Sequence, residues 1–227
     1  MKEKHVLADA STLISLTSSC LLHSLKFFHE KFGVRFFIPQ SVEYEAVTRP
    51  LSLKVKIHRF SALRIKKMIN EDLIHVVEDN LEKETRELMK LGNSVFYARG
   101  KPLNLFHKGE VEMLALARKL DMGSLLMDER TTRILIEEPD ALRMHLQHEF
   151  KTNILINRNN LSKFLSGLSH MEVVRSTELI YLAYKNGFFS NYDELEAEAA
   201  EAALYKLKYS GCAISFKELE EYGKLIK

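Results

Sequence analysis

The stretch that decides the fold covers residues 124–133 and reads Ser-Leu-Leu-Met-Asp-Glu-Arg-Thr-Thr-Arg. In it a short apolar run meets two acids, Asp128 and Glu129, and then turns into a polar segment that can begin a helix. This pattern is typical of a buried strand that ends in acids, and ligands of open parallel sheets bind at that end of the strands. Residues 6–8 lead into Asp9 in the same way. We expect these two strand ends to lie side by side.

Strands and helices alternate from the N-terminus onward. Residues 5–8 and 34–38 have the length and composition of buried strands, and apolar residues recur at helical spacing over residues 11–25. Such alternation predicts an α/β fold in which helices cover both faces of a parallel sheet, an α/β/α sandwich. Residues 153–156 have the composition of the last strand of this sheet. From residue 161 onward the sequence shows only helical patterns.

The chain is long enough for one substantial core with an appendage, at 227 residues and 46% hydrophobic composition. We divide it into a core at residues 1–160 and an all-helical extension at residues 161–227 that packs on the core. Two stretches of the core, around residues 91–107 and 137–150, look like insertions. Aromatic residues beside cations in the first insertion suit stacking on unpaired bases, but packing beneath a long loop explains them as well.

Composition excludes several classes of protein. The net charge of +2 gives no overall field that would identify a nucleic-acid partner. No apolar run approaches the roughly 20 residues that span a bilayer, and the first residues do not resemble a signal peptide. The two cysteines, Cys20 and Cys212, lie far apart in the sequence, which argues against a disulfide framework and a cysteine zinc site. We therefore expect a cytoplasmic protein that has no membrane partner.

Residues 53–68 combine apolar positions at helical spacing with several cations, among them Lys54 and Arg59. The spacing predicts a basic amphipathic helix whose inner face carries Leu53, Ile57, Phe60 and Leu63. A basic helix face can hold a phosphate backbone. A solvated surface helix explains the same charges, so both interpretations stay open.

Two further acids have positions that favour a site at the strand ends. Glu45 follows Val42 by three positions and so borders the inner face of its helix. Glu110 follows Gly109 in the first turn of another predicted helix. Taken singly, each acid is explained by helix capping or by the helix dipole.

The combination of acids favours a metal site. In a doubly wound sheet whose chain order reverses beside the first strand, Asp9 and Asp128 flank the crevice. Clustered carboxylates raise one another's pKa, and a divalent cation relieves the repulsion. Oxygen ligands without a cysteine cluster favour Mg²⁺ or Mn²⁺. Such a site suits phosphodiester hydrolysis, in which a metal generates hydroxide and stabilises developing charge.

Four stretches carry a resemblance to a known family. They read VLADASTLI from residue 6, IPQSVEYEAV from residue 38, HKGEVEMLALA from residue 107 and SLLMDER from residue 124. In order and spacing they resemble the motifs of PIN-domain nucleases, over residues 5–160. The chain is most similar to the branch with a Gly-Glu third motif and a helical C-terminal extension, because AYKNGFF from residue 183 and SGCAIS from residue 210 resemble the tail of that branch.

The resemblance implies a parallel sheet in the order 3-2-1-4-5 and a metal-dependent nuclease, most often an endoribonuclease that acts on single-stranded RNA. It implies that Ser11 supports the ligands with its hydroxyl, and that Glu129, where this branch commonly has a second aspartate, is a further candidate ligand. Because this branch includes relatives of toxins, an antitoxin and a second copy of the chain are candidate partners. The metal-binding and catalytic acids carried over by position are Asp9, Glu45, Glu110 and Asp128.

Arg130 and Arg133 follow the predicted site closely enough to touch a phosphate, although salt bridges to neighbouring helices explain them equally well. With Lys54 and Arg59 they are the candidate substrate-binding residues. Two alternatives to an RNA-directed nuclease stay open. One is a nuclease directed at DNA, and the other is a non-catalytic RNA- or protein-binding scaffold whose carboxylates only cap helices.

Overall fold

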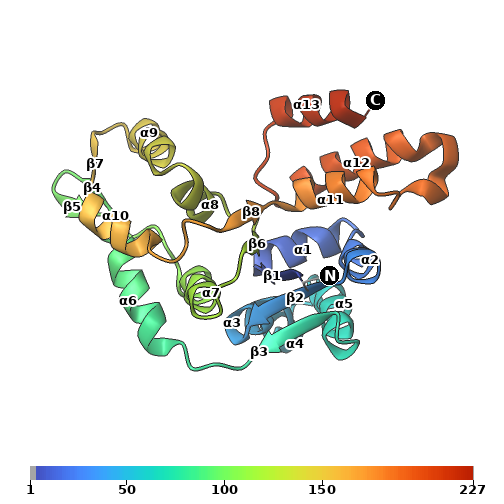
Figure 1. The fold of residues 1–227 in the computed structure, drawn as a ribbon, viewed down its shortest axis with the longest axis horizontal. Coiled ribbons are helices and arrows are strands. Elements are labelled where there is room, and N and C mark those ends of the chain that lie inside the picture. The colour runs from blue at the N-terminus through green and yellow to red at the C-terminus, as the bar shows by residue number, and fades with distance from the viewer. Residues whose placement is uncertain (1–3, 227) are drawn as a thin grey trace.

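A five-stranded parallel sheet forms the centre of the computed structural model, which describes residues 4–226 (Figure 1). From one edge to the other its strands are β3 (Ile74–Val77), β2 (Val34–Pro39), β1 (Lys4–Ala8), β6 (Ser124–Leu126) and β8 (Glu172–Val174). Every neighbouring pair is parallel. Counted as the first to fifth strands of this sheet, they have the predicted order 3-2-1-4-5, and the α/β prediction is confirmed.

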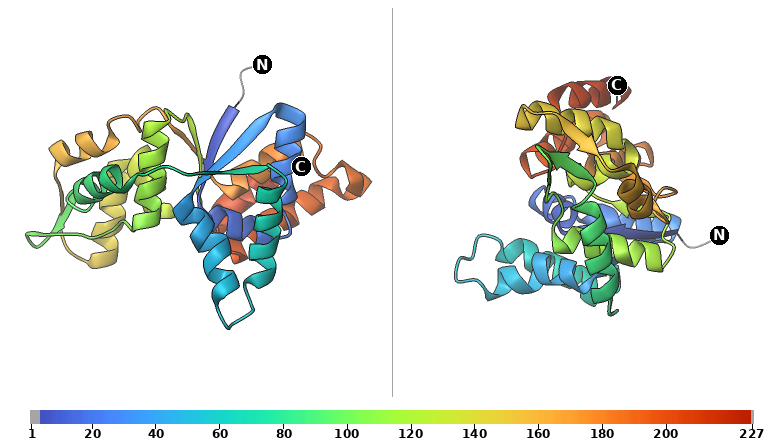
Figure 2. Two further views of the ribbon diagram at one scale, coloured as in Figure 1. Left: turned by 90° about the horizontal axis from the view of Figure 1, so that it is seen from below. Right: turned by 90° about the vertical axis from the view of Figure 1, so that its left-hand side faces the viewer.

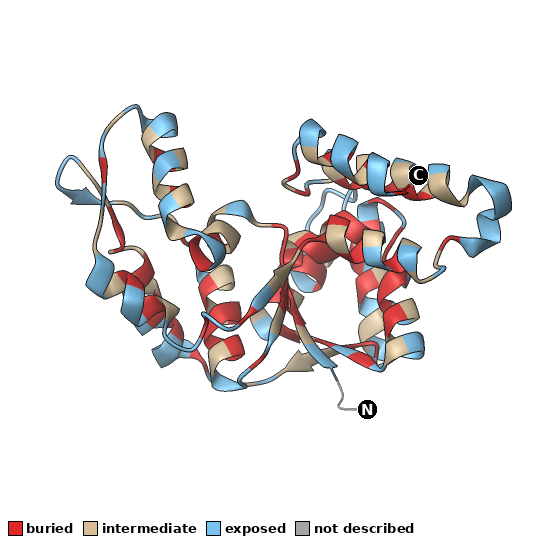
Figure 3. Ribbon diagram, turned by 45° about the horizontal axis from the view of Figure 1, so that its top comes forward, coloured by how far each residue is buried: buried red, intermediate tan, exposed pale blue. Residues whose placement is uncertain are grey.

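The sheet separates two hydrophobic cores. Successive strand residues point to opposite faces, so Leu7 and Leu125 belong to one core, whereas Ala8 and Leu126 belong to the other. All four side chains are almost completely buried. A strand buried on both faces reads as a continuous apolar run, which is why β1 and β6 could be predicted. Figure 3 shows buried residues along these strands and on the helix faces turned toward them.

Helices cover both faces of the sheet (Figure 1). One core is built with α1 (Ala10–Ser18), α2 (His23–Phe32), α5 (Arg59–Asn70), α11 (Ser176–Lys185), α12 (Glu196–Tyr209) and α13 (Phe216–Ile226). The other core is built with α6 (Glu82–Gly92), α7 (Lys108–Lys119), α8 (Arg130–Glu137), α9 (Pro139–Phe150) and α10 (Arg158–Leu165). Between residues 4 and 226 no helix is long and apolar enough to cross a membrane.

The prediction for the last strand of the main sheet was wrong. Residues 154–156 form β7 (Ile154–Ile156), which pairs antiparallel with β4 (Phe96–Ala98) in a separate sheet completed by β5 (Lys101–Pro102). In β7, Ile154 is buried but Leu155 is 60% exposed, as in an antiparallel strand with one wet face. The fifth strand of the main sheet is β8, so residues 161–227 are not all helical, although the C-terminal region beyond β8 is.

The two stretches that look like insertions contribute to a second lobe, seen at the left of Figure 1 and at the left of the left-hand view in Figure 2. Residues 91–107 supply β4 and β5, and residues 137–150 supply all of α9. Phe106 is buried and stacks on Phe164 of α10, with ring centroids 5.6 Å apart. A Cβ on Gly92 would lie 2.8 Å from the Phe164 ring, so close packing requires glycine there. The aromatic residue Phe106 therefore packs beneath the loop.

The predicted helix over residues 53–68 was only partly right. The chain forms α3 (Gln40–Glu43), a π-helical turn η1 (Tyr44–Thr48) and α4 (Arg49–Ser52), then an irregular loop, and α5 begins only at Arg59. The core takes Ala62 and Ile65 of α5, both fully buried. The expected inner face is consequently exposed, at 44% for Leu53, 76% for Ile57, 71% for Phe60 and 53% for Leu63.

Candidate functional site

The two strand ends that carry Asp9 and Asp128 lie side by side, as predicted. Ala8 at the end of β1 pairs with Leu126 at the end of β6, and the backbone N–H of Asp9 donates to the carbonyl of Leu126 at 3.0 Å. The chain leaves β1 for α1 on one side of the sheet and leaves β6 for α8 on the other. This is the switch point at which open α/β sheets bind ligands.

Asp9 is the buried acid at this switch point, 7% exposed. Its Oδ1 accepts the backbone N–H of Thr12 at 2.7 Å and so caps α1, while its Oδ2 accepts the hydroxyl of Ser11 at 2.5 Å. Burial raises the pKa of Asp9 to about 7, against the opposing effect of these hydrogen bonds and with a further contribution from the charge of Asp128. Burial therefore favours the protonated form of the Asp9 carboxyl.

Asp128 is still more deeply buried, at 2% exposed. Its Oδ1 accepts the backbone N–H of Ser176 at 2.8 Å and the thiol of Cys212 at 3.3 Å, and its Oδ2 accepts the hydroxyl of Ser176 at 2.8 Å. The carboxylate thus joins the end of β6 to the start of α11 and to the segment before α13. Burial and the neighbouring charge of Asp128 raise the pKa of Cys212 to about 12, so its thiol remains a donor.

Glu45 and Glu110 lie near each other and interact through their charges. Glu45 lies on the π-helical turn η1, and its Oε2 would be 3.6 Å from a Cβ on Gly109, the residue before Glu110. Glu110 accepts the backbone N–H of His107 at 3.0 Å. Burial raises the pKa of Glu110, and the charges of Glu129 and Glu45 add to the effect, while the hydrogen bond from His107 opposes it.

Glu129 has a structural task of its own. It is the N-cap of α8, and its two oxygens accept the backbone N–H groups of Thr131 at 2.7 Å and Thr132 at 2.6 Å. Two of the backbone donors that lack a partner within the helix are thereby satisfied. This side chain can serve as a metal ligand only by sharing or giving up the cap.

The acids form two groups rather than one set of ligands around a single ion. Asp9 interacts with Asp128, and Glu110 interacts with Glu45 and Glu129. As the side chains stand, no three His, Cys, Asp or Glu residues within positions 4–226 could hold one ion. The donor chemistry nevertheless fits a hard divalent cation, since all five donors are carboxylates and two of them have raised pKa values.

The four candidate substrate-binding cations are divided between two places. Arg130 and Arg133 line a cavity of about 490 Å³ between α8 and the segment that precedes α13. Arg133 is largely buried and pairs with Glu137 at 2.9 Å. Lys54 is exposed in the loop before α5, whereas Arg59 turns back and donates to the carbonyl of Leu53 at 2.9 Å. Lys54 and Arg130 are the exposed members of this set.

Sequence reasoning missed Ser176 and Cys212, the two residues that bind Asp128. Ser176 had a usable signal, because it follows the apolar pair Val173 and Val174 as polar residues follow the other strands. Cys212 lies in the SGCAIS stretch that resembles the tail of the branch, but nothing in that stretch indicates a contact with Asp128, 84 positions earlier.

Comparison with known proteins finds no family model, no curated protein and no solved structure that matches this chain. The resemblance of its four motifs to PIN-domain nucleases therefore remains a prediction from the sequence.

Proposed function

We propose that the chain is a Mg²⁺- or Mn²⁺-dependent endonuclease that hydrolyses phosphodiester bonds in single-stranded RNA. The observation that carries the proposal is the state of Asp9, a buried carboxyl at the switch point whose pKa is raised to about 7 beside a second acid. A bound divalent cation would neutralise the repulsion between the two carboxylates. Perturbed acids in this position on a sheet are typical of functional sites.

In this proposal Asp9, Asp128, Glu45 and Glu110 hold the cation, and Glu129 can add an oxygen if its cap opens. A bound Mg²⁺ or Mn²⁺ supplies Lewis acidity to phosphodiester hydrolysis. The hydroxyl of Ser11 donates to Asp9 and holds that carboxylate in one orientation. Arg130, exposed on the first turn of α8, is the cation that contacts a substrate phosphate.

The resemblance to toxin relatives extends the proposal to partners and place of action. It adds an antitoxin as a protein partner that controls the nuclease, and a second copy of the chain. It also places the proposed activity in the cytoplasm, where single-stranded RNA would be the substrate.

A second candidate function, a non-catalytic scaffold that binds RNA or protein, is favoured by one observation. The Asp128 carboxylate already accepts three donors from Ser176 and Cys212. A carboxylate engaged in this way serves the fold, and the acids at the other helix starts also serve as caps.

A chelator-controlled cleavage assay on labelled single-stranded RNA and DNA separates the two functions. With Mn²⁺ the proposal expects RNA cleavage that EDTA stops and that Asp9→Asn or Glu110→Gln lowers by at least about 100-fold. Glu84→Gln, an exposed acid on α6, is the matched control and should cleave like the unchanged protein.

The outcomes assign the function as follows. Cleavage of DNA alone keeps the nuclease and changes its substrate. Cleavage that survives EDTA, or that both variants retain, rules out the metal site. RNA binding without cleavage, insensitive to EDTA, supports the scaffold instead.

A further inference from the structure

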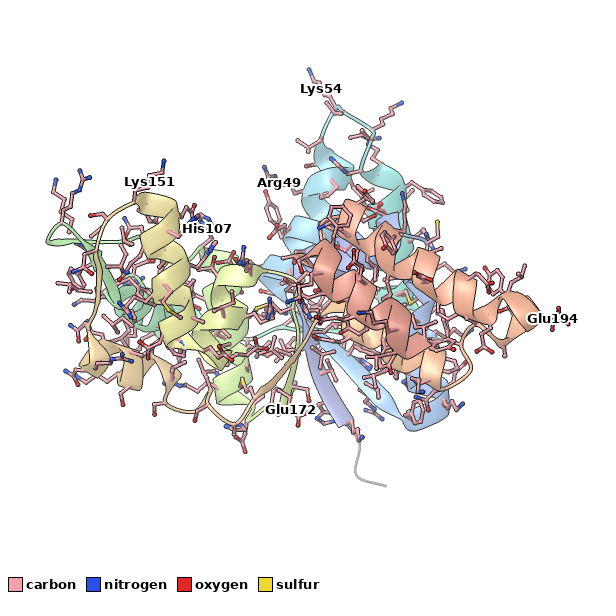
Figure 4. All side chains as sticks on the ribbon, turned by 90° about the horizontal axis from the view of Figure 1, so that it is seen from above. Arg49, Lys54, His107, Lys151, Glu172 and Glu194 are labelled. Atoms are coloured by element: carbon pink, nitrogen blue, oxygen red, sulfur yellow. The ribbon has the colours of Figure 1, made fainter. Side chains whose placement is uncertain are left out.

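The segment of residues 49–66, here called the basic arm, presents apolar and cationic side chains together. It projects from the body as the hairpin of α4 and the first part of α5, with Lys54 at its tip (Figures 2 and 4). Val55, Ile57 and Phe60 are 66%, 76% and 71% exposed. The sequence contains no acid between Glu45 and Glu71. Several exposed apolar side chains on one projecting segment indicate an interaction surface.

Internal contacts fix the shape of the basic arm. Arg59 holds the loop through the carbonyl of Leu53, and Arg64 donates to the carbonyl of Thr17 in α1 at 3.1 Å. Arg64 also lies over the Phe60 ring, 5.9 Å from its centroid. Lys54 and Lys56 remain exposed at the tip. The arm is therefore pre-organised to present a fixed surface, which lowers the entropic cost of docking.

A second protrusion has the opposite charge. Residues 190–198, here called the acidic tip, comprise the 3₁₀ turn η2 (Ser190–Leu195) and the start of α12. Tyr192 and Leu195 are 51% and 61% exposed, among the acids Asp193, Glu194, Glu196 and Glu198. The sequence contains no Lys, Arg or His between Lys185 and Lys206.

We infer that the basic arm of one copy of this chain docks on the acidic tip of another copy. The two protrusions match in charge, and each carries the exposed apolar side chains that an interface centre needs. Within one copy they point in different directions, Lys54 from one side of the body and Glu194 from one end (Figure 4). This inference is independent of the proposed nuclease activity.

Other occupants fit the basic arm less well. Single-stranded nucleic acid binds by stacking bases on aromatic rings, but the loop side chains Leu53, Val55 and Ile57 are aliphatic, and Arg64 already lies over the exposed ring of Phe60. An anionic lipid surface would bind both the cations and the aliphatic side chains of the arm, but it would not account for the exposed apolar side chains of the acidic tip. A second copy accounts for both protrusions.

Charge reversal tests the inference by sedimentation velocity, at chain concentrations from about 1 μM to about 300 μM. The unchanged protein should self-associate with increasing concentration, and about 0.5 M NaCl should weaken the association. Lys54→Glu with Lys56→Glu in one variant, and Glu194→Lys with Glu196→Lys in another, should each raise the dissociation constant at least about tenfold.

Mixing the two variants is the decisive measurement, because each reversed protrusion then faces a complementary one on the other variant. The mixture should associate as the unchanged protein does. Lys83→Glu with Lys101→Glu, two exposed lysines of the second lobe, is the matched control and should leave association unchanged. Circular dichroism confirms that each variant is folded.

Three outcomes would overturn the inference. The first is a monomer throughout the concentration range. The second is self-association that neither reversal weakens or that the mixture does not restore. The third is a monomer that binds single-stranded RNA or vesicles of anionic phospholipid through Lys54 and Lys56, which would assign the arm to one of those occupants.

Discussion

The thiol of Cys212 lies 3.3 Å from Oδ1 of Asp128, 84 positions earlier in the chain. Through this contact the segment between α12 and α13 closes over the end of β6. Burial and the Asp128 charge both disfavour the thiolate, and the pKa of Cys212 rises to about 12. The thiolate is the reactive form of cysteine, so the structure makes Cys212 an inert thiol.

The first prediction is a difference in reactivity between the two cysteines. Cys20 is exposed and Cys212 is buried. In the folded protein a disulfide reagent such as Ellman's reagent should modify Cys20 alone at pH 8, and in urea it should modify both. Cys20→Ser should abolish the fast reaction, and rapid modification of Cys212 in that folded variant would contradict the assignment.

The second prediction concerns the stability that Asp128 provides. Asp128→Ala leaves the backbone N–H and the hydroxyl of Ser176 without their acceptor, and it opens a cavity. Buried donors without partners cost about 1–3 kcal/mol each, so we expect a loss of about 2–4 kcal/mol in the free energy of unfolding, measured with urea. Asp128→Asn keeps one acceptor oxygen and should lose less.

Glu87→Ala, an exposed acid on α6, is the matched control for Asp128→Ala and should change the free energy of unfolding by less than about 0.5 kcal/mol. If Asp128→Ala were equally harmless, the hydrogen bonds to Ser176 would not hold in solution. A loss of stability in Asp128→Asn would also explain lost cleavage without a metal, which is why the nuclease test relies on Asp9 and Glu110.

The third prediction concerns the ion pairs that join α11 to α13. The buried guanidinium of Arg175 donates to Glu178 at 2.8 Å and to Glu218 at 2.7 Å. Burial works to raise the pKa of Glu218, but hydrogen bonds from Ser215 and the Arg175 contact lower it to about 2. Because the folded pKa is depressed, this stabilisation is present above the ordinary glutamate pKa and is lost as pH falls toward 2.

Glu218→Gln should therefore lower the free energy of unfolding at pH 7 by about 1–2 kcal/mol, a value reduced by the partial exposure of Glu218. The deficit should shrink as urea titrations move from pH 7 to pH 3. Glu220→Gln on the exposed side of α13 should show neither effect. An equal deficit at both pH values would mean that the pair with Arg175 is not what stabilises this junction.

Much of the main sheet could be predicted, and β8 shows why the rest could not. Strands β1 and β2 are five and six residues long, and they contain the apolar runs 6–8 and 36–38. Strand β8 has three residues, and Glu172 in it is exposed. Strand β6 is equally short, but its apolar run continues into the buried Met127, whereas β8 begins on an acid and is followed directly by Arg175. The competing segment 153–156 has the better composition but pairs with β4, a choice set by contacts between distant segments.

The candidate site divides in the same way. Asp9 and Asp128 could be placed together because strand order determines where strand ends meet. Which face of α5 packs on the core could not be predicted, because the apolar residues over 53–68 are spaced so that either of two helix faces could be buried. Ala62 and Ile65 pack inward, which leaves Phe60 and Leu63 exposed. The basic arm results from that choice.

The fourth prediction is the pH dependence that Asp9 imposes on stability. Its pKa rises from 3.8 to about 7 on folding, so between these values the folded chain binds more protons than the unfolded chain. The contribution of Asp9 to the free energy of unfolding is therefore greatest below pH 4, and it decreases as the pH rises to 7. At 1.36 kcal/mol per pH unit the loss reaches at most about 4 kcal/mol. Asp9→Asn retains a capping oxygen for Thr12, and it should not show this loss of stability with rising pH.

Urea unfolding in EDTA tests this dependence at pH 5 and pH 8. Asp9→Asn should gain stability relative to the unchanged protein at pH 8 and gain less at pH 5. Asp72→Asn, an exposed acid after α5, should show no such gain. If Asp9→Asn were the less stable protein at pH 8, the Asp9 carboxylate would be favourably solvated in the fold. Mn²⁺ in place of EDTA should then stabilise the unchanged protein more at pH 8 than at pH 5, because a cation and a proton compete for the same oxygens.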